Sequence, residues 1–390
     1  MSLLEIITKS AADAESTVKT PSPYPIILNP DRIFPLLKPQ IAEEEPLPIQ
    51  RVQGWKISDL DSQIISLSHK FFKKLKRKLK NPNSLSRTEF LDLLNSFLDQ
   101  NSEKTGLSIG ISPSDHEFTR RAIEKVGFLI NRDVAGLILD ACVEIDLWEV
   151  VETLILNGVV AGEAALGLVE KMVERRRSDM LCLFVKHVVD IRSSDLLLIL
   201  KYFLSPATDA GLPGVRKEWE RQALSAIEKA AGEKKKSPLG TQAAVLLAAA
   251  YDGFSTQELC LHYLFGSENV DGLALSGAVA GLGGVEMLRL VRYLGKWLKK
   301  YERFPDAAPC KSAESLLGLE ACRWVPTLEA VVRCLGVVLD EHFSYLVLNP
   351  NFQEELVQIE GVVRSLQLEA GLCSSVGYLI ENLRLDAEIQ

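Results

Sequence analysis

The sequence lacks the residue patterns that mark most metal sites and nucleotide-binding enzymes. It has no C-x-x-C and no H-x-x-x-H pair, the close spacings at which zinc sites take their ligands. Its five histidines lie far apart, at positions 69, 116, 187, 262 and 342. The glycine-rich stretch at 272–285 has neither the lysine of a P-loop nor a G-x-G-x-x-G fingerprint. We therefore expect no metal, no cofactor and no small-molecule substrate.

Catalytic groupings are scarce as well. "GLSIG" at 106–110 fits the nucleophile-elbow pattern around Ser108, but that motif works only between an entering strand and a departing helix. Polar residues precede it here, so we interpret Ser108 as part of a surface loop. His342 stands beside Asp340 and Glu341, yet on a helix only residues three or four apart meet. The sequence predicts a protein that is not an enzyme.

Long apolar runs and export signals are missing too. The longest uncharged apolar candidate has fourteen residues, at 272–285, whereas about twenty are needed to span a bilayer. The N-terminus has Glu5 within its short apolar stretch and no basic region before it, unlike a signal peptide. Seven cysteines lie singly within apolar runs, and their odd number fits reduced, buried thiols. We expect a location in the cytosol or nucleus and no transmembrane segment.

Acids outnumber basic residues, 52 to 44, but positive charge is concentrated in one block. The formal net charge is -8, yet seven of the first eleven residues of "KFFKKLKRKLKNPNS" at 70–84 are Lys or Arg. Residues 64–88 hold eight Lys or Arg and no acid, whereas residues 340–390 hold two Arg and nine acids. Such blocks are typical of contact with an oppositely charged partner. The candidate residues are Lys70, Lys73, Lys74, Lys76, Arg77, Lys78 and Lys80.

These cations belong to a predicted amphipathic helix. Ser58 or Asp59 suits its N-cap, and Pro82 ends it. A stripe at three- and four-residue spacing faces inward: Ile64, Ser68, Phe71, Leu75 and Leu79. The cationic face then suits nucleic-acid phosphates, nuclear targeting, an anionic membrane, a calmodulin-like groove, or water alone. Because Lys lacks the bidentate geometry of Arg, its dominance favours charge contact over base reading.

The fold is predicted to be all-α, an irregular helical-repeat array or bundle with a C-terminal helical hairpin. Eight of the 17 prolines fall at 21–48, which predicts an extended, disordered Pro-rich arm. No stretch shows sustained β alternation. The expected parts are an arm at 1–55, an N-terminal helical domain at 56–204, a linker region with one helix at 205–240, and a C-terminal helical domain at 241–390.

Two local patterns refine this prediction. Ser-Asp pairs at 178–179 and 194–195 predict helix starts, each with a capping hydroxyl and a carboxylate at the positive end of the helix dipole. Gly277 and Gly281, four residues apart, predict a close approach of two helices.

The segment 331–367, "VVRCLGVVLDEHFSYLVLNPNFQEELVQIEGVVRSLQ", resembles the C-terminal end of the nucleolar protein 11 family, a component of the small-subunit processome. The resemblance covers under a tenth of the chain. The β-propeller that begins that family is missing, and Cys334 stands where a tryptophan is expected. The resemblance rests on Leu339, Asp340, His342, Phe343, Pro350, Glu360, Gly361 and Leu366.

What the resemblance implies is a propeller-less relative that assembles with other proteins in pre-ribosomal RNA transcription or early processing. The expected protein is a non-catalytic helical scaffold of the nucleus and nucleolus, with protein partners in a large assembly and RNA contact through the basic helix. The alternative is a cytosolic helical-repeat adaptor whose basic helix is structural or faces a membrane.

Overall fold

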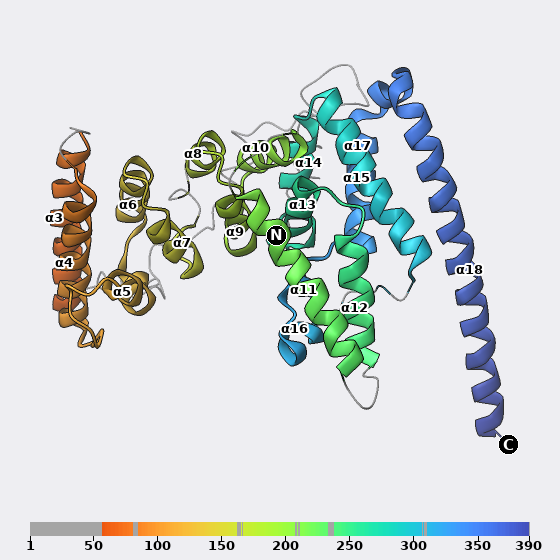
Figure 1. Cartoon of the computed structure of the whole chain (residues 1–390), viewed down its shortest axis with the longest axis horizontal. Helices are drawn as coiled ribbons and strands as arrows, with labels where there is room; N and C mark the ends of the chain where they lie inside the picture. Colours follow the sequence, from red (N-terminus) through yellow and green to blue (C-terminus); the bar gives the residue numbers. More distant parts are fainter. Residues whose placement is uncertain are drawn as a thin grey trace, which may run out of the picture. The chain divides into compact units, whose positions relative to one another are not determined.

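The computed structural model describes residues 57–80, 85–161, 165, 167–206, 209, 211–232, 238–305, 307 and 310–389, with the backbone alone for 379–389. Within these ranges every regular element is a helix, which confirms the all-α prediction (Figure 1). The arm expected at 1–55 lies outside the described residues.

The first helices pack on near neighbours in the chain. Helix α3 contacts α4 and α6, α5 contacts α4 and α7, and α8 contacts α9 and α10. Short helices that cannot stand alone are stabilised by stacking of this kind. The elements are α3 (Asp59–Leu79), α4 (Arg87–Thr105), α5 (Phe118–Val126), η2 (Gly127–Leu129), α6 (Arg132–Glu144), α7 (Trp148–Leu156), α8 (Leu168–Glu174), α9 (Ser178–His187) and α10 (Ser193–Leu204).

The later helices pack around α13 and α15. Helix α13 contacts α11 and α17 as well as α9 and α10 of the first group, and α15 contacts both α17 and α18. The elements are α11 (Leu212–Gly232), α12 (Pro238–Tyr251), α13 (Thr256–Gly266), α14 (Gly272–Ala280), α15 (Gly284–Arg303), α16 (Ser312–Leu317), η4 (Glu320–Trp324), α17 (Leu328–Leu348), η5 (Pro350–Phe352) and α18 (Gln353–Ile389).

Packing between helices continues through the region where the sequence predicts a linker. Residues 58–390 form one compact unit. The single helix expected in 205–240 is α11, which packs on α12 and α13. Residues 233–237 lie outside the described residues. The division into helical domains at 56–204 and 241–390 stays a prediction.

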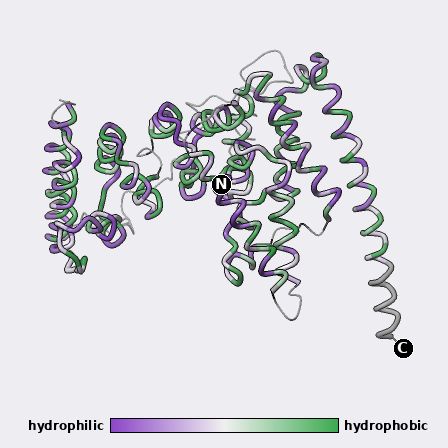
Figure 2. Tube along the Cα trace, viewed as in Figure 1, coloured by the Kyte–Doolittle hydropathy of each residue, from purple (hydrophilic) through white to green (hydrophobic). Residues whose placement is uncertain are grey.

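The inward stripe of α3 packs as its spacing predicts. Ser68, Phe71 and Leu75 are buried, and the Phe71 ring stacks on Phe97 of α4 with centroids 4.4 Å apart. The side chain of Ser58 caps the helix by accepting a hydrogen bond from a backbone N–H of the first turn. Figure 2 shows apolar and polar residues alternating along the tube of α3.

Two glycines allow α14 to approach α10. A Cβ added to Gly277 would lie 3.0 Å from the Ser193 hydroxyl, and one added to Gly281 would lie 2.6 Å from a methyl carbon of Leu197. Both distances are shorter than ordinary van der Waals contact. The predicted role of these glycines in close helix packing is therefore confirmed.

The helix starts predicted at the Ser-Asp pairs are confirmed, but the predicted capping hydroxyls are wrong. Neither α9 nor α10 has a side-chain hydrogen bond at its N-cap. The Ser178 hydroxyl instead donates to Asp209 at 2.8 Å. Asp179 and Asp195 do lie in the first turns, where each accepts from the arginine at the N-cap position. The Ser178 hydroxyl, which the local sequence predicts as a helix cap, is instead hydrogen-bonded to a carboxylate that is distant in the sequence.

A buried aromatic cluster joins α13 to α11 and α15. His262 is fully buried, with Nε2 3.0 Å from the Ala250 carbonyl and Nδ1 2.9 Å from the Tyr293 hydroxyl. A carbonyl requires a donor, so Nε2 carries the proton and Nδ1 accepts from Tyr293. The rings of Trp219 and Trp297 pack against the imidazole. Burial lowers the pKa of His262 to about 3, which keeps the ring neutral.

This depressed pKa predicts a pH dependence of stability. The unfolded histidine takes up a proton near pH 6.5 while the folded one resists protonation until about pH 3, so stability falls as pH falls through that window. Urea unfolding at pH 7.5, 6.5, 5.5 and 4.5 measures the decline. His262→Gln should be less stable at pH 7.5 and show a shallower decline. Equal slopes for the two proteins would contradict the assignment.

Gly266 and Gly336 form a matched pair for testing the packing. A Cβ on Gly266 would lie 2.9 Å from the Cα of Trp324 and closer still to its carbonyl, whereas Gly336 of α17 faces open space. Gly266→Ala should cost about 3 kcal/mol, as overpacking against backbone does. Gly336→Ala should gain about 0.5–1 kcal/mol from helix propensity. Chemical denaturation of both variants checks this, and similar values for the two would refute the packing.

Candidate nucleic-acid interface

Four of the predicted cations form a ridge along α3. Lys70, Lys73, Lys74 and Arg77 stand at positions i, i+3, i+4 and i+7, so they share one face of the helix. We call these four residues the cationic ridge. At 1.5 Å per residue the ridge is about 10 Å long. All four side chains are exposed, and Figure 1 shows α3 as the first of the drawn helices.

The buried stripe of α3 determines where the ridge points. Phe71 and Leu75 face α4 and α6, and the helical period places the centre of the ridge about 130° around the axis from them. The cations therefore cannot turn inward while the stripe stays packed. Among the residues that the structure describes, no carboxylate lies within ion-pair distance of any ridge cation.

The other three predicted cations lie at the margins of the ridge. Lys78 forms an ion pair with Glu89 of α4 and is partly buried. Lys76 lies over the Phe72 ring, 5.3 Å from its centroid. Lys80, at the C-cap of α3, is exposed. The structure thus brings six of the seven predicted cations to the surface and places Lys78 in a structural contact.

The helix itself gains from part of this charge. Lys76, Arg77 and Lys78 lie in the last turn of α3, where the helix dipole is negative. Asp59 and Asp61 lie in the first turn, where it is positive. Each such charge contributes about 0.3–1 kcal/mol at low salt. The dipole accounts for the last-turn cations but not for Lys70, Lys73 and Lys74 in the middle of the helix.

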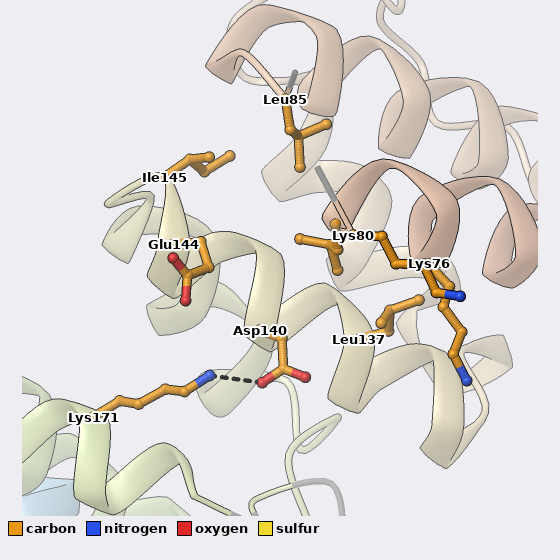
Figure 3. Close-up of a pocket in the computed structure, with 9 residues that line it drawn as sticks. Lys76, Lys80, Leu85, Leu137, Asp140, Glu144, Ile145 and Lys171 are labelled. Atoms are coloured by element: carbon orange, nitrogen blue, oxygen red, sulfur yellow. Dashed lines mark hydrogen bonds and ion pairs between the residues drawn. The ribbon is translucent and has the colours of Figure 1, made fainter. Parts of the chain in front are cut away.

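A cleft of about 610 Å³ lies beside the ridge, between α3 and α6. Lys76 and Lys80 extend from α3, and the carboxylates of Asp140 and Glu144 come from α6 (Figure 3). Asp140 accepts from Lys171 at 2.8 Å. The cleft therefore carries lysines and carboxylates together, whereas the exposed ridge carries cations alone and is the better place for a polyanion.

The residues of the family resemblance are distributed over α17, η5 and α18, the C-terminal hairpin, whose two long helices both pack on α15. His342 is half-buried at a kink in α17, and its Nε2 lies 2.8 Å from the Val279 carbonyl, so it donates to backbone and not to a neighbouring acid. Leu339 and Leu366 are half-buried. The remaining members point outward: Asp340, Phe343, Pro350, Glu360 and Gly361 are exposed. Phe343 is 65% exposed, which makes this hairpin an apolar surface.

The remaining candidate chemistry does not converge. Ser108 is exposed in a loop, and its backbone carbonyl accepts from Lys125. Across the described ranges no group of three or more His, Cys, Asp or Glu side chains is arranged to hold a metal ion. None of the helices there combines the length and apolar content of a membrane span.

Comparison with known proteins adds no family. No family model matches the chain, and neither a curated protein nor a solved structure is significantly similar to it.

The sequence predicts the seven cations of α3 but not the contacts that distinguish the four ridge residues from the other three. The ion pair of Lys78 with Glu89 depends on how α4 packs on α3, and the cleft that Lys76 and Asp140 both line depends on how α6 packs on α3. The period of α3 offers one signal, since it places Lys78 and Lys76 on either side of the buried stripe. The period of α3 does not show that Glu89 lies near Lys78 or that Asp140 lines the same cleft as Lys76.

Thiol reactivity should follow burial. Six of the seven cysteines are buried, and Cys373 is exposed. Burial shields these six thiols from the reagent, and at Cys334 it also raises the pKa to about 12, which leaves almost none of the reactive thiolate at that residue. Ellman's reagent at pH 8 should therefore titrate one thiol quickly in the native protein and seven in denaturant. Cys373→Ser should abolish the fast phase, and a fast phase that persists would show that a second thiol is accessible.

Proposed function

We propose that the protein is a non-catalytic helical scaffold that binds RNA through the cationic ridge and assembles with other proteins in small-subunit ribosome biogenesis in the nucleolus. The observation that carries the RNA contact is the ridge itself: four exposed cations without a carboxylate partner in the described chain, held outward by a buried stripe. Phosphate contacts of this kind are independent of base sequence and sensitive to salt.

The packing of α3 supports RNA over a bilayer or a calmodulin-like groove. Both of those partners take up the apolar face of a basic amphipathic helix. In this protein Phe71 is 5% exposed and Leu75 is fully buried. The apolar face is therefore available only if α3 leaves α4 and α6. A phosphate backbone needs the cations alone, and those are already exposed.

The assembly role is supported by the C-terminal hairpin. Its outward residues include Phe343 and the exposed acids Asp340 and Glu360. Large exposed apolar side chains grouped on one element mark protein contact surfaces. The nucleolar location rests on the resemblance of 331–367 to the nucleolar protein 11 family. The alternative, a cytosolic adaptor, retains the hairpin as a contact surface and treats the ridge as a solvated helix face.

Neutralising the ridge tests RNA binding. The full chain is titrated into a fluorescein-labelled 20-nucleotide poly(U) RNA at 50–200 mM KCl, with anisotropy as the readout. Replacing all four ridge residues by Gln should weaken binding at least tenfold at 50 mM KCl. The slope of log K against log salt should fall in magnitude by about 3, because each phosphate contact on a single strand contributes about 0.7. Gln preserves helix propensity.

A matched variant controls for net charge. Four exposed cations on other helices are replaced by Gln: Lys104, Arg175, Lys217 and Arg333. This control should bind RNA within about twofold of the wild type, since screened charges far from the contact add little. Equal loss in the two variants would show that overall charge, and not the ridge, attracts the RNA. No binding by the wild type would remove the RNA proposal.

Cellular location separates the proposed function from its alternative. A tagged full-length chain should accumulate in the nucleolus and co-purify with ribosome-assembly proteins. Replacing Phe343 by Ser should reduce that recovery while leaving the fold intact by circular dichroism, because the side chain is exposed. A cytosolic distribution with recovery of vesicle-coat proteins would favour the adaptor.

A further inference from the structure

Two buried cysteines lie in contact where the chain turns between α15 and α17. Cys310 stands two residues before α16, and Cys322 lies in η4. Their side chains are 5% and 1% exposed, and both are free thiols. The two thiols share a hydrogen bond. Two thiols in contact are already close to the arrangement from which a disulfide forms.

Three backbone hydrogen bonds in series bring these cysteines together. The Ala313 N–H donates to the Cys310 carbonyl at 3.0 Å, and the Leu319 N–H donates to the Ala313 carbonyl at 3.2 Å. The Cys322 N–H then donates to the Leu319 carbonyl at 3.1 Å. Gly318 ends α16 in the left-handed region, at a φ of 63°, and turns the chain back toward its start. The path of the backbone therefore holds the two residues side by side.

The hydrogen bond between the two thiols makes them chemically unequal. Donation from Cys322 lowers the pKa of the Cys310 thiol below its ordinary value. The same hydrogen bond raises the pKa of Cys322, and burial adds to the rise. Because the thiolate is the reactive form of cysteine, Cys310 is the nucleophile of the pair and Cys322 is its partner thiol. A low-pKa thiol beside a second thiol is the arrangement found at peroxide-sensitive cysteines.

A second pair of cysteines provides a comparison. Cys182 of α9 and Cys260 of α13 also share a side-chain hydrogen bond, which together with burial raises the pKa of Cys260. The thiol of Cys260 also donates to the Thr256 carbonyl at 3.4 Å. The residues on either side of Cys260 are buried, whereas Cys310 adjoins the exposed Lys311. Hydrogen peroxide, which is much smaller than Ellman's reagent, therefore has a shorter path to Cys310 than to the second pair.

We propose that Cys310 and Cys322 form an oxidative modification site, at which hydrogen peroxide converts the two thiols to a disulfide. The Cys310 thiolate attacks one peroxide oxygen, the O–O bond breaks, and the departing hydroxide takes up the proton that Cys310 released. The Cys322 sulfur then attacks the sulfur of the Cys310 sulfenic acid, and the S–O bond breaks. That oxygen leaves as a second water with the Cys322 proton. Two thiols are oxidised by two electrons, and one peroxide is reduced to two waters.

The disulfide would tie α16 to η4. Helix η4 packs on α11, α12 and α13, and the backbone of Trp324 lies directly against Gly266. Oxidation would therefore fasten the short helix α16 to the packed body of the later helices. Disulfides of cytosolic and nuclear proteins are mostly transient, and a dithiol reductant of the thioredoxin class reverses this one by thiol exchange. The site lies on other helices than the cationic ridge and does not depend on RNA binding.

Peptide mapping of the full chain tests the site. The protein is reduced, freed of reductant, treated with hydrogen peroxide, alkylated in denaturant and digested with trypsin without reduction. Trypsin cuts after Arg303, Lys311 and Arg323, so the two cysteines fall in separate peptides, 304–311 and 312–323. The expected product is these peptides joined, about 2 Da lighter than their sum because two hydrogens are lost. Dithiothreitol should separate them.

Single variants separate the roles of the two cysteines. In Cys322→Ser the sulfenic acid on Cys310 has no partner thiol, so dimedone should label Cys310 after peroxide treatment. In Cys310→Ser the remaining thiol has lost its nucleophilic neighbour, so dimedone should label Cys322 at least tenfold less. Circular dichroism verifies the fold of each variant. Equal labelling of the two variants would overturn the assigned roles.

The map of the wild-type protein decides the proposal even where a variant fails to fold. The link between Cys310 and Cys322 should exceed any link between Cys182 and Cys260 at least tenfold. Oxidation of the exposed Cys373 serves as the internal proof that peroxide was active. Oxidised Cys373 without the expected link would overturn the proposal. A preferred link between Cys182 and Cys260, or of Cys310 to Cys373, would overturn it as well.

Discussion

The burial of one face of α3 is the constraint on which the candidate interface depends. Phe71 and Leu75 must lie against α4 and α6 to leave water, and each such side chain contributes about 1.5–3 kcal/mol when buried. Once they are packed, the helical period leaves the ridge cations no direction but outward. The surface charge of the protein is thus a consequence of its core. A partner that needs the apolar face must pay for unpacking it, whereas a phosphate backbone need not.

The two ends of the described chain use helical amphipathicity in opposite ways. In α3 the apolar face is buried and the exposed face is basic. In α17 and α18 one apolar face of each helix is buried, with Val338 and Ile359 among its residues. Other apolar side chains of these helices, such as Phe343, remain exposed near acidic residues. In the proposed function, the ridge contacts a polyanion and the exposed apolar residues of the C-terminal hairpin contact protein partners. The array of helices between them supplies a packed connection and no convergent catalytic groups among the described residues.

The sequence predicted what depends on periodicity, and it missed what depends on distant contacts. The stripe and cap of α3 and the close approach at Gly277 are local patterns, and the structure confirms them. The Ser178 hydroxyl donates a hydrogen bond to Asp209, 31 residues away, and Lys78 forms an ion pair with Glu89 on the next helix. Local propensity cannot rank a cap against an acceptor brought by folding. Nor can local propensity show where along α18 its contacts with α15 end.

The most direct test of the account is lysine footprinting with an acetylating reagent on the full chain, free and with excess poly(U) RNA, read by mass spectrometry. The account predicts that Lys70, Lys73 and Lys74 react readily in the free protein and become protected by RNA, while exposed Lys217 reacts equally in both states. Protection spread over all exposed lysines, or none on α3, would contradict it.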